Sequence, residues 1–257
     1  MWGETVLIRV LVCFICFFSS VVNAGSFKVF PLKLVFDSQQ KTSLFRITNT
    51  DKAPVSVQLQ AAVWSQDKDG EDIYSKTSDI IFFPKIVEVN AGEERVVRVA
   101  YKGNPNKKFE QSYRLFAQEL PQKSKAGGAL SFALRFSVPI FVSYPRAKAF
   151  PVVEPLGVEN GNLLIQVRNE GSKHLVVSNI KVAAIDGSNN EIHNFQVKGW
   201  YVLPKSQRVF SVPIDEELCL KSDKYNLDLN IGRSNIKKRL LNNSRQCAKV
   251  ISSRLDQ

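Results

Sequence analysis

Histidine and cysteine, the side chains that most often hold zinc and act as nucleophile or base, are scarce in this sequence. The 257 residues include only two histidines, His174 and His193, and four cysteines. Structural and catalytic zinc sites use three or four ligands, which the two histidines cannot supply without carboxylates of unknown placement, because the cysteines are assigned below to a leader and to a disulfide. The acidic run 67–72 resembles part of a calcium loop, but it lacks the full EF-hand spacing and the terminal glutamate. A solvated hairpin turn is the better interpretation of that run.

Motifs of the common enzyme classes are also missing from the sequence. It contains no phosphate-binding loop, no dinucleotide fingerprint and no Gly-x-Ser-x-Gly nucleophile elbow. Ser206 and His193 have no spacing that marks them as a catalytic pair. We therefore predict a protein that is not an enzyme, with no catalytic residues, no metal and no cofactor.

Residues 1–24 have the pattern of a secretory signal peptide. Arg9 ends a short N-terminal region, an apolar run follows over 10–18, and Val22-Asn23-Ala24 offers the small residues that signal peptidase accepts. A transmembrane anchor is the alternative, but the run is shorter than the roughly 20 apolar residues that span a bilayer. No later segment is apolar for long enough, so we expect an exported chain without stable membrane insertion.

Two of the cysteines, Cys13 and Cys16, lie in this leader, which leaves Cys219 and Cys247 in the exported chain. An even pair in an oxidising compartment indicates a disulfide, to which loop-closure entropy would give roughly 3–4 kcal/mol. Two free buried thiols are the alternative.

The formal net charge is +11, and basic residues are dense over 232–257. Such a segment could bind nucleic acid or an anionic surface. The sequence shows no recognition-helix pattern and no interleaving of aromatic with basic residues. We therefore expect a solvated basic face and no nucleic-acid partner.

The dominant hydrophobic period is two, which is typical of half-buried β-strands. Apolar and polar residues alternate over 55–63 and 96–101, and turn signals such as Asp69-Gly70 and Asp186-Gly187 separate the runs. Only 234–243 has a modest helical period. Short strands at this spacing predict an all-β chain of β-sandwich domains.

Prolines at 145, 151 and 155 interrupt the strand pattern once, near the middle of the chain. We place the domain boundary there, with an N-terminal domain over 25–148 and a C-terminal domain over 149–257. A hydrophobic fraction of 44% excludes a wholly disordered chain.

One strand pattern, over 130–138, has five bulky apolar side chains on a single face. This ridge comprises Leu130, Phe132, Leu134, Phe136 and Val138. An ordinary core-facing strand would explain it. Alternatively, the ridge fills the groove of a partner that lacks a strand, with main-chain hydrogen bonds supplying affinity and alternate side chains supplying fit. Each buried anchor would then contribute ~1.5–3 kcal/mol. The pattern alone leaves both interpretations open.

Several blocks of the chain resemble the periplasmic pilus-assembly chaperones in order and spacing. These blocks are residues 27–36, 47–54, 83–99, 112–121 and 130–145, and the resemblance is weaker over 156–257. It implies two immunoglobulin-like β-sandwich domains at an angle and a location in the periplasm. It also implies a chaperone that binds pilin subunits by donor-strand complementation and delivers them to an outer-membrane usher.

The resemblance assigns roles to particular residues. Leu130, Phe132 and Leu134 fall on the donor positions, and Phe136 and Val138 continue that face or turn into the chaperone's own core. The family anchors the subunit's C-terminal carboxylate with basic residues, for which we assign Arg114 as the main anchor and Lys33 as its helper. A carboxylate there would form charge-assisted hydrogen bonds. A surface charge is the alternative for each basic residue.

Two positions depart from the best-known pattern of the family. Lys33 stands at the first-strand arginine position, and Pro139 stands at the donor-strand lysine position. This ending and the Tyr113-Arg114 pair resemble the archaic, or alternative, branch of these chaperones. Arg98 and Glu110 lie where the family forms an interdomain ionic network, and independent surface charges are the alternative.

Other functions and states stay open from the sequence alone. A secreted immunoglobulin-like adhesin or carbohydrate-binding module would need exposed aromatic platforms, for which Trp200-Tyr201 is the obvious candidate. An enzyme of the copper-zinc type would need more histidines than the chain has. An exposed ridge would favour aggregation, which a self-capping dimer would prevent.

Overall fold

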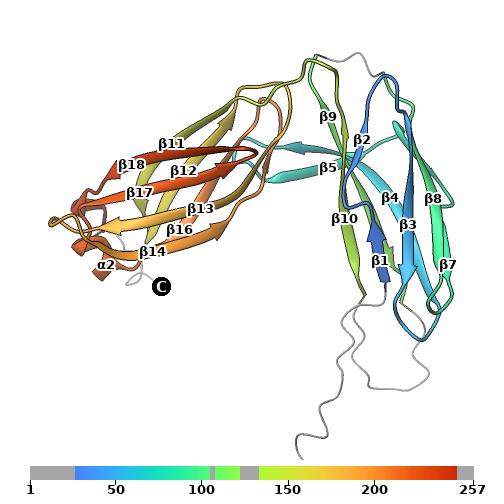
Figure 1. The fold of residues 1–257 in the computed structure, drawn as a ribbon, viewed down its shortest axis with the longest axis horizontal. Coiled ribbons are helices and arrows are strands. Elements are labelled where there is room, and N and C mark those ends of the chain that lie inside the picture. The colour runs from blue at the N-terminus through green and yellow to red at the C-terminus, as the bar shows by residue number, and fades with distance from the viewer. Residues whose placement is uncertain (1–26, 105–107, 122–132, 248–257) are drawn as a thin grey trace, which may run out of the picture.

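The computed structural model describes residues 27–104, 108–121 and 133–247. They form two β-sandwiches set at an angle and joined by the segment between β10 (Arg135–Val142) and β11 (Pro151–Glu159) (Figure 1). This confirms the predicted fold class, an all-β chain of two immunoglobulin-like sandwiches. The predicted signal peptide lies outside the described residues. Within the described ranges, no helix is long and apolar enough to cross a membrane.

The first sandwich packs two sheets face to face. One has the strand order β1-β3-β8-β6, and the other has the order β2-β10-β9-β4-β5, with β7 beside β4. Their strands besides β10 are β1 (Phe27–Phe30), β2 (Leu34–Phe36), β3 (Thr42–Asn49), β4 (Val55–Gln66), β5 (Asp72–Lys76), β6 (Ile80–Phe83), β7 (Ile86–Val89), β8 (Glu94–Tyr101) and β9 (Gln111–Glu119). The chain thus crosses from one sheet to the other between β1 and β2, and β2 pairs in parallel with β10.

The second sandwich is built from the remaining strands. One sheet has the order β11-β12-β16, and the other has the order β14-β13-β17-β18, with β15 beside β13. These elements are β12 (Asn162–Asn169), β13 (Leu175–Ile185), β14 (Glu191–Lys198), β15 (Tyr201–Val202), β16 (Gln207–Pro213), α2 (Glu216–Lys221), β17 (Lys224–Ile231), β18 (Ser234–Leu241) and α3 (Ser244–Cys247).

The alternation predicted from the sequence is the alternation of burial. In β4, Val55, Val57 and Leu59 are buried in the first core, whereas Gln58 and Gln60 are exposed. Successive side chains of a strand point to opposite faces, so every second residue enters the sandwich. The two cores are separate clusters of buried side chains, one in each sandwich.

The helix indicated over 234–243 is wrong, because residues Ser234–Leu241 form strand β18, which pairs with β17. Ile236 and Leu240 pack against the second core. Their spacing of four residues suits one face of a helix and equally one face of a strand. The main-chain ladder to β17 decides between the two.

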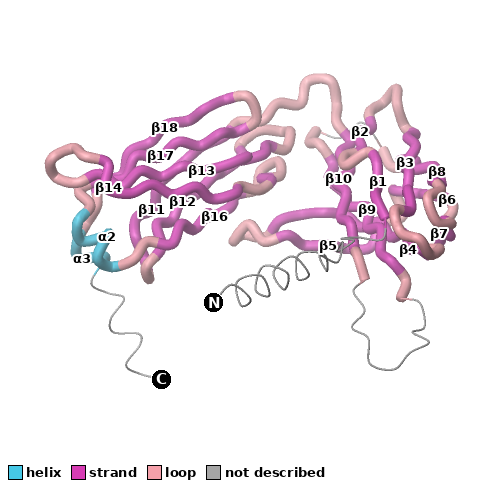
Figure 2. Tube along the Cα trace, turned by 60° about the horizontal axis from the view of Figure 1, so that its bottom comes forward, coloured by secondary structure: helices cyan, strands magenta, loops and turns pink. Residues whose placement is uncertain are grey.

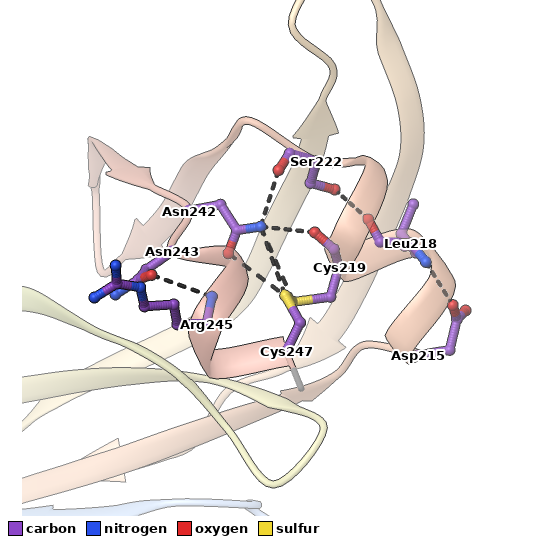
Figure 3. Close-up of a disulfide and its surroundings, with 8 residues drawn as sticks. All are labelled: Asp215, Leu218, Cys219, Ser222, Asn242, Asn243, Arg245 and Cys247. Carbon is purple, nitrogen blue, oxygen red and sulfur yellow. Dashed lines mark hydrogen bonds between the residues drawn. A yellow bond between two sulfur atoms is a disulfide. The ribbon is translucent and has the colours of Figure 1, made fainter. Parts of the chain in front are cut away.

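A disulfide joins Cys219 of α2 to Cys247 of α3, as expected for an exported chain. Figure 3 shows that Asn242 supports this link, since its side-chain amide donates to the carbonyl oxygens of Cys219 (2.7 Å) and Ser222 (2.9 Å). Asp215 caps α2 by accepting from the amide of Leu218 at 2.8 Å. The helices α2 and α3, which the sequence did not predict, therefore close one end of the second sandwich as a cross-linked unit.

Candidate functional site

The strand β10, which contains the end of the apolar ridge, pairs unevenly along its two edges. It pairs antiparallel with β9 over its whole length, Arg135 to Val142. On its other edge it pairs with β2 only over Ile140–Val142. Among the described residues, the segment 135–139 therefore has no strand on its second edge.

The main-chain groups of Arg135 and Ser137 are directed to that edge. The carbonyl oxygen of Leu134 accepts from the amide of Glu119 in β9, at 2.8 Å, whereas the amide of Ser143 donates to Phe36 in β2, at 2.9 Å. Hydrogen-bonding direction alternates along a strand of an antiparallel pair. Arg135 and Ser137 therefore direct their N–H and C=O groups away from β9, as a strand that receives another strand must, although the Ser137 carbonyl oxygen already accepts from the Arg114 side chain at 3.3 Å.

The described residues of the ridge differ in burial: one lies in the core, and two lie partly exposed at the end of the sandwich. Val138 is buried, with 2% of its surface exposed, whereas Leu134 and Phe136 are only partly buried against the core. Phe136 makes an edge-to-face contact with Phe27 at 5.0 Å between ring centroids. The other two predicted donor residues, Leu130 and Phe132, lie outside the described residues.

Arg114 does not lie on the surface, since only 3% of it is exposed. It is on the face of β9 opposite the core, and its guanidinium carbon lies 3.7 Å from the ring centroid of Trp64. Two aromatic residues of the second sandwich also approach it, Trp200 at 5.6 Å and Tyr201 at 5.5 Å. Cation–π contacts of this kind stabilise a desolvated guanidinium.

The hydrogen-bonding capacity of Arg114 is largely unused. Its Nη1 donates to the carbonyl oxygen of Ser137 at 3.3 Å, but Nε and Nη2 are buried and have no partner among the described residues. Burial lowers the pKa of the guanidinium from its usual value, and nearby oxygen atoms, that of Tyr74 foremost, offset part of this effect. Because arginine stays protonated in proteins, Arg114 is a buried cation, and the negative charge of Asp72 lies near it.

Lys33 and Arg114 occupy the same row of this sheet. Leu34 pairs with Ile140 and Pro139 pairs with Arg114, so Lys33, which directly precedes β2, falls beside Pro139. Leu34 points into the core, so Lys33 lies on the opposite face, as Arg114 does. Lys33 is exposed, whereas Arg114 is enclosed.

Comparison with known proteins identifies the first sandwich. The sequence model of the pili and flagellar-assembly chaperones, PapD N-terminal domain, matches residues 26–147. The N-terminal domain belongs to this family of chaperones. No curated protein matched the sequence.

Solved structures extend the likeness over both sandwiches. They include the CsuC–CsuE chaperone–tip adhesion subunit pre-assembly complex of archaic Csu pili from Acinetobacter baumannii, which is 24% identical, with a TM-score of 0.58, over 84% of this chain and 98% of that one. The CupB2 chaperone of Pseudomonas aeruginosa is 16% identical, with a TM-score of 0.56 over 84% and 100% of the two chains. The SafB chaperone in its complex with the SafA pilin, from Salmonella enterica, is 11% identical, with a TM-score of 0.55 over 86% of this chain and 98% of that one. At these identities the likeness establishes the fold.

A hairpin of the chaperone-family domain forms much of its contact with the second sandwich. The hairpin of β4 and β5 extends toward the second sandwich in two views (Figures 1 and 2). Gln66 accepts from the amide of Leu203 and donates to the carbonyl oxygen of Tyr201, both at 2.9 Å. Arg208 of β16 donates to the carbonyl oxygen of Gly70 at 2.6 Å. Sequence reasoning missed these contacts, because the partners are more than a hundred positions apart.

Glu110 makes a second contact between the two sandwiches. It is 4% exposed, accepts from the amide of His174 at 2.9 Å, and also pairs with the His174 ring and the Ser143 hydroxyl. Arg98, by contrast, is exposed on β8 of the other sheet. The interdomain role expected from the resemblance thus holds for Glu110, with His174 as its partner, and not for Arg98.

Glu110 should make the stability of the chaperone-family domain depend on pH. Burial alone would raise the pKa of its carboxyl, but hydrogen bonds and charge from His174, with Ser143, lower it overall. A lowered folded-state pKa gives stability that is fully present above the unfolded value, about 4.3, and is lost as pH falls through the folded value. We expect Glu110→Gln to lower the free energy of unfolding by about 1.5 kcal/mol at neutral pH, and the difference to shrink below about pH 4.

Urea unfolding of wild type and Glu110→Gln across this pH range measures the effect. Glu88→Gln, which alters an exposed carboxylate on β7, is the control and should leave the profile unchanged. A Glu110→Gln difference that grows as the pH falls would contradict this account.

Proposed function

We propose that this chain is a periplasmic chaperone that binds pilin subunits by donor-strand complementation and delivers them to an outer-membrane usher. The observation that carries the proposal is the edge of β10 over 135–139, which has no partner strand among the described residues. Family membership supports it, as do solved relatives described as a chaperone–tip adhesion subunit complex and a pilin–chaperone complex.

Within this proposal, the donor segment comprises Leu130, Phe132, Leu134 and Phe136. The last two remain partly exposed at the end of the sandwich, next to the open edge. A pilin that lacks one strand would gain main-chain hydrogen bonds from β10 and would cover these side chains. Val138 belongs to the chaperone's own core.

Arg114 and Lys33 are the proposed anchors for the C-terminal carboxylate of the subunit. The Nε and Nη2 donors of Arg114, which have no hydrogen-bond partner among the described residues, support this role, because a bound carboxylate would recover the free energy that burying these donors costs. Lys33, exposed in the same row, would attract the carboxylate as a point charge.

The remaining parts of the proposal concern the whole chain. Residues 1–24 direct export and are removed, and the chaperone domain over 25–148 is followed by a second domain over 149–257. Pro139 in β10 and the Tyr113-Arg114 pair favour the archaic branch. Genes for an usher and for small pilins beside the gene of this chain would support delivery to an usher.

The anchor assignment predicts a ranking of two variants. Arg114→Ala should weaken capture of a co-expressed pilin about 10- to 100-fold, since it removes charge-assisted hydrogen bonds from an enclosed site. Lys33→Ala should weaken capture less, because an exposed charge pair is worth little. Yields of co-purified subunit and titration of the purified pairs measure both. The opposite ranking would demote Arg114 from main anchor.

A further inference from the structure

The guanidinium of Arg114 is covered by side chains of unequal burial. Trp64, which stacks closest, is 2% exposed and belongs to the small apolar cluster between the sandwiches. Trp200 is 40% exposed, and Tyr74, whose oxygen raises the pKa of Arg114, is 44% exposed. Trp200 and Tyr74 are therefore the two neighbours that can move without opening a core.

One carboxylate, that of Asp72, holds both of these exposed rings. Its Oδ2 accepts from Trp200 Nε1 at 2.9 Å and from the Tyr74 hydroxyl at 3.3 Å. Its Oδ1 accepts from Gln66 at 3.1 Å and lies 3.6 Å from Nη1 of Arg208. The carboxylate thus connects a ring from each sandwich, and its own side chain is only 14% exposed.

The backbone at Trp200 is fixed on the second sandwich. The amide of Val177 donates to the carbonyl oxygen of Trp200 at 2.9 Å, and a Cβ at Gly199 would lie 2.1 Å from the Val177 carbonyl oxygen. A shift of the chain here would break this hydrogen bond and the close packing of Gly199 on Val177, so the indole moves off Arg114 by rotation of its side chain.

We propose that Trp200 of the second domain, positioned by Asp72, covers Arg114 together with Tyr74, and that a terminal carboxylate reaches the guanidinium by displacing this cover. The inference rests on the proposed function, in which Arg114 receives the carboxylate. Asp72 supplies a negative charge near Arg114 while the site is empty. The cover admits the narrow end of an extended chain and keeps water from the unused donors of Arg114, so the second domain takes part in selecting what binds.

The reactivity of Arg114 toward phenylglyoxal tests the cover without any pilin. Mass spectrometry of the modified protein gives the rate at Arg114 relative to the exposed Arg98. We expect Arg114 to react slowly in wild type and about tenfold faster in Trp200→Phe, which keeps an aromatic ring and loses one hydrogen bond to a carboxylate. Tyr74→Phe, which removes the other hydrogen bond to Asp72, should also raise the rate of modification at Arg114. It replaces Trp200→Phe as the test if that variant does not fold.

A matched control removes side-chain bulk elsewhere in the second domain. Ile192→Ala alters a residue of similar exposure, 37%, on β14 and should leave the rate at Arg114 unchanged. Acetate, compared with chloride at equal ionic strength, should protect Arg114 more strongly in Trp200→Phe than in wild type, because the carboxylate then has access. Equal rates at Arg114 in wild type and in both cover variants would overturn the proposal.

This experiment separates the cover from the function on which it rests. If Arg114 reacts as expected but Arg114→Ala still captures pilin at wild-type yield, the cover stands and the anchor role fails. If Arg114 in wild type reacts as fast as Arg98, the cover fails whatever the result of the capture assay.

Discussion

Leu134→Asp is expected to abolish the capture of pilin while the chaperone remains folded. Leu134 lies at the end of the first sandwich, partly buried, beside the open edge of β10. Removing its apolar surface would cost ~1.5–3 kcal/mol of binding free energy, and placing a carboxylate in the pilin groove adds a desolvation penalty. The affinity should therefore fall by more than about 100-fold. Phe132→Asp, at the next donor position, should have the same effect.

A matched variant distinguishes lost binding from lost stability. Leu44→Asp introduces the same charge at a residue that is 45% exposed on β3, in the sheet that does not contain β10. Co-purification of pilin, with thermal unfolding of each variant measured alone, gives the comparison. If Leu134→Asp and Phe132→Asp both hold pilin at wild-type yield, the assignment of the donor strand is wrong.

Gly70→Ala should separate the β4–β5 hairpin from the second sandwich. Gly70 has a φ of +85°, and a Cβ there would lie 2.5 Å from the Gln207 carbonyl oxygen and 2.6 Å from the Cα of Arg208. The left-handed conformation costs about 1–2 kcal/mol for a residue with a side chain. The overlap with main-chain atoms adds about 1–3 kcal/mol or displaces the hairpin.

Gly92→Ala is the control for the conformational part of this effect. Gly92 has a φ of +73°, but a Cβ there would meet nothing within 4 Å. Both variants should therefore be destabilised by the cost of the left-handed conformation, and only Gly70→Ala should also lose contacts between the sandwiches. Small-angle scattering and limited proteolysis would detect the separation. Equal losses of stability with unchanged scattering in both variants would show that the hairpin does not fix the domain arrangement.

The sequence predicted the elements whose residues are close along the chain. Alternation over β4 and the turn signals at Asp69-Gly70 and Asp186-Gly187 correspond to strands and hairpin turns in the structure, because strand period and turn chemistry are local properties. The helix indicated over 234–243 failed because Ile236 and Leu240 satisfy both periods. The helix α2 was missed, since six residues are too few for a helical period to be evident.

The candidate site could be predicted only in part. The ridge marked Leu134, Phe136 and Val138 as one face, but not the point at which that face enters the core. The enclosure of Arg114 was not predictable, because it depends on Trp200 and Asp72, which are 128 positions apart and meet only when the two sandwiches pack together. Long-range contacts of this kind leave no periodic signal in one sequence.

Phe141 gives β10 a further property. Two residues after Pro139, its ring stacks on His174 of the second sandwich, with centroids 3.6 Å apart, and it packs with Trp64 and Leu203. The strand that offers its edge therefore continues directly into the joint between the sandwiches. Suppose that a subunit strand bound at this edge favours a rigid arrangement of the joint by some factor. Thermodynamic reciprocity then requires that the rigid arrangement raise the affinity for the subunit strand by the same factor. Substitutions at Phe141 would then change the affinity for the subunit and the rigidity of the joint together, although Phe141 need not touch the bound subunit.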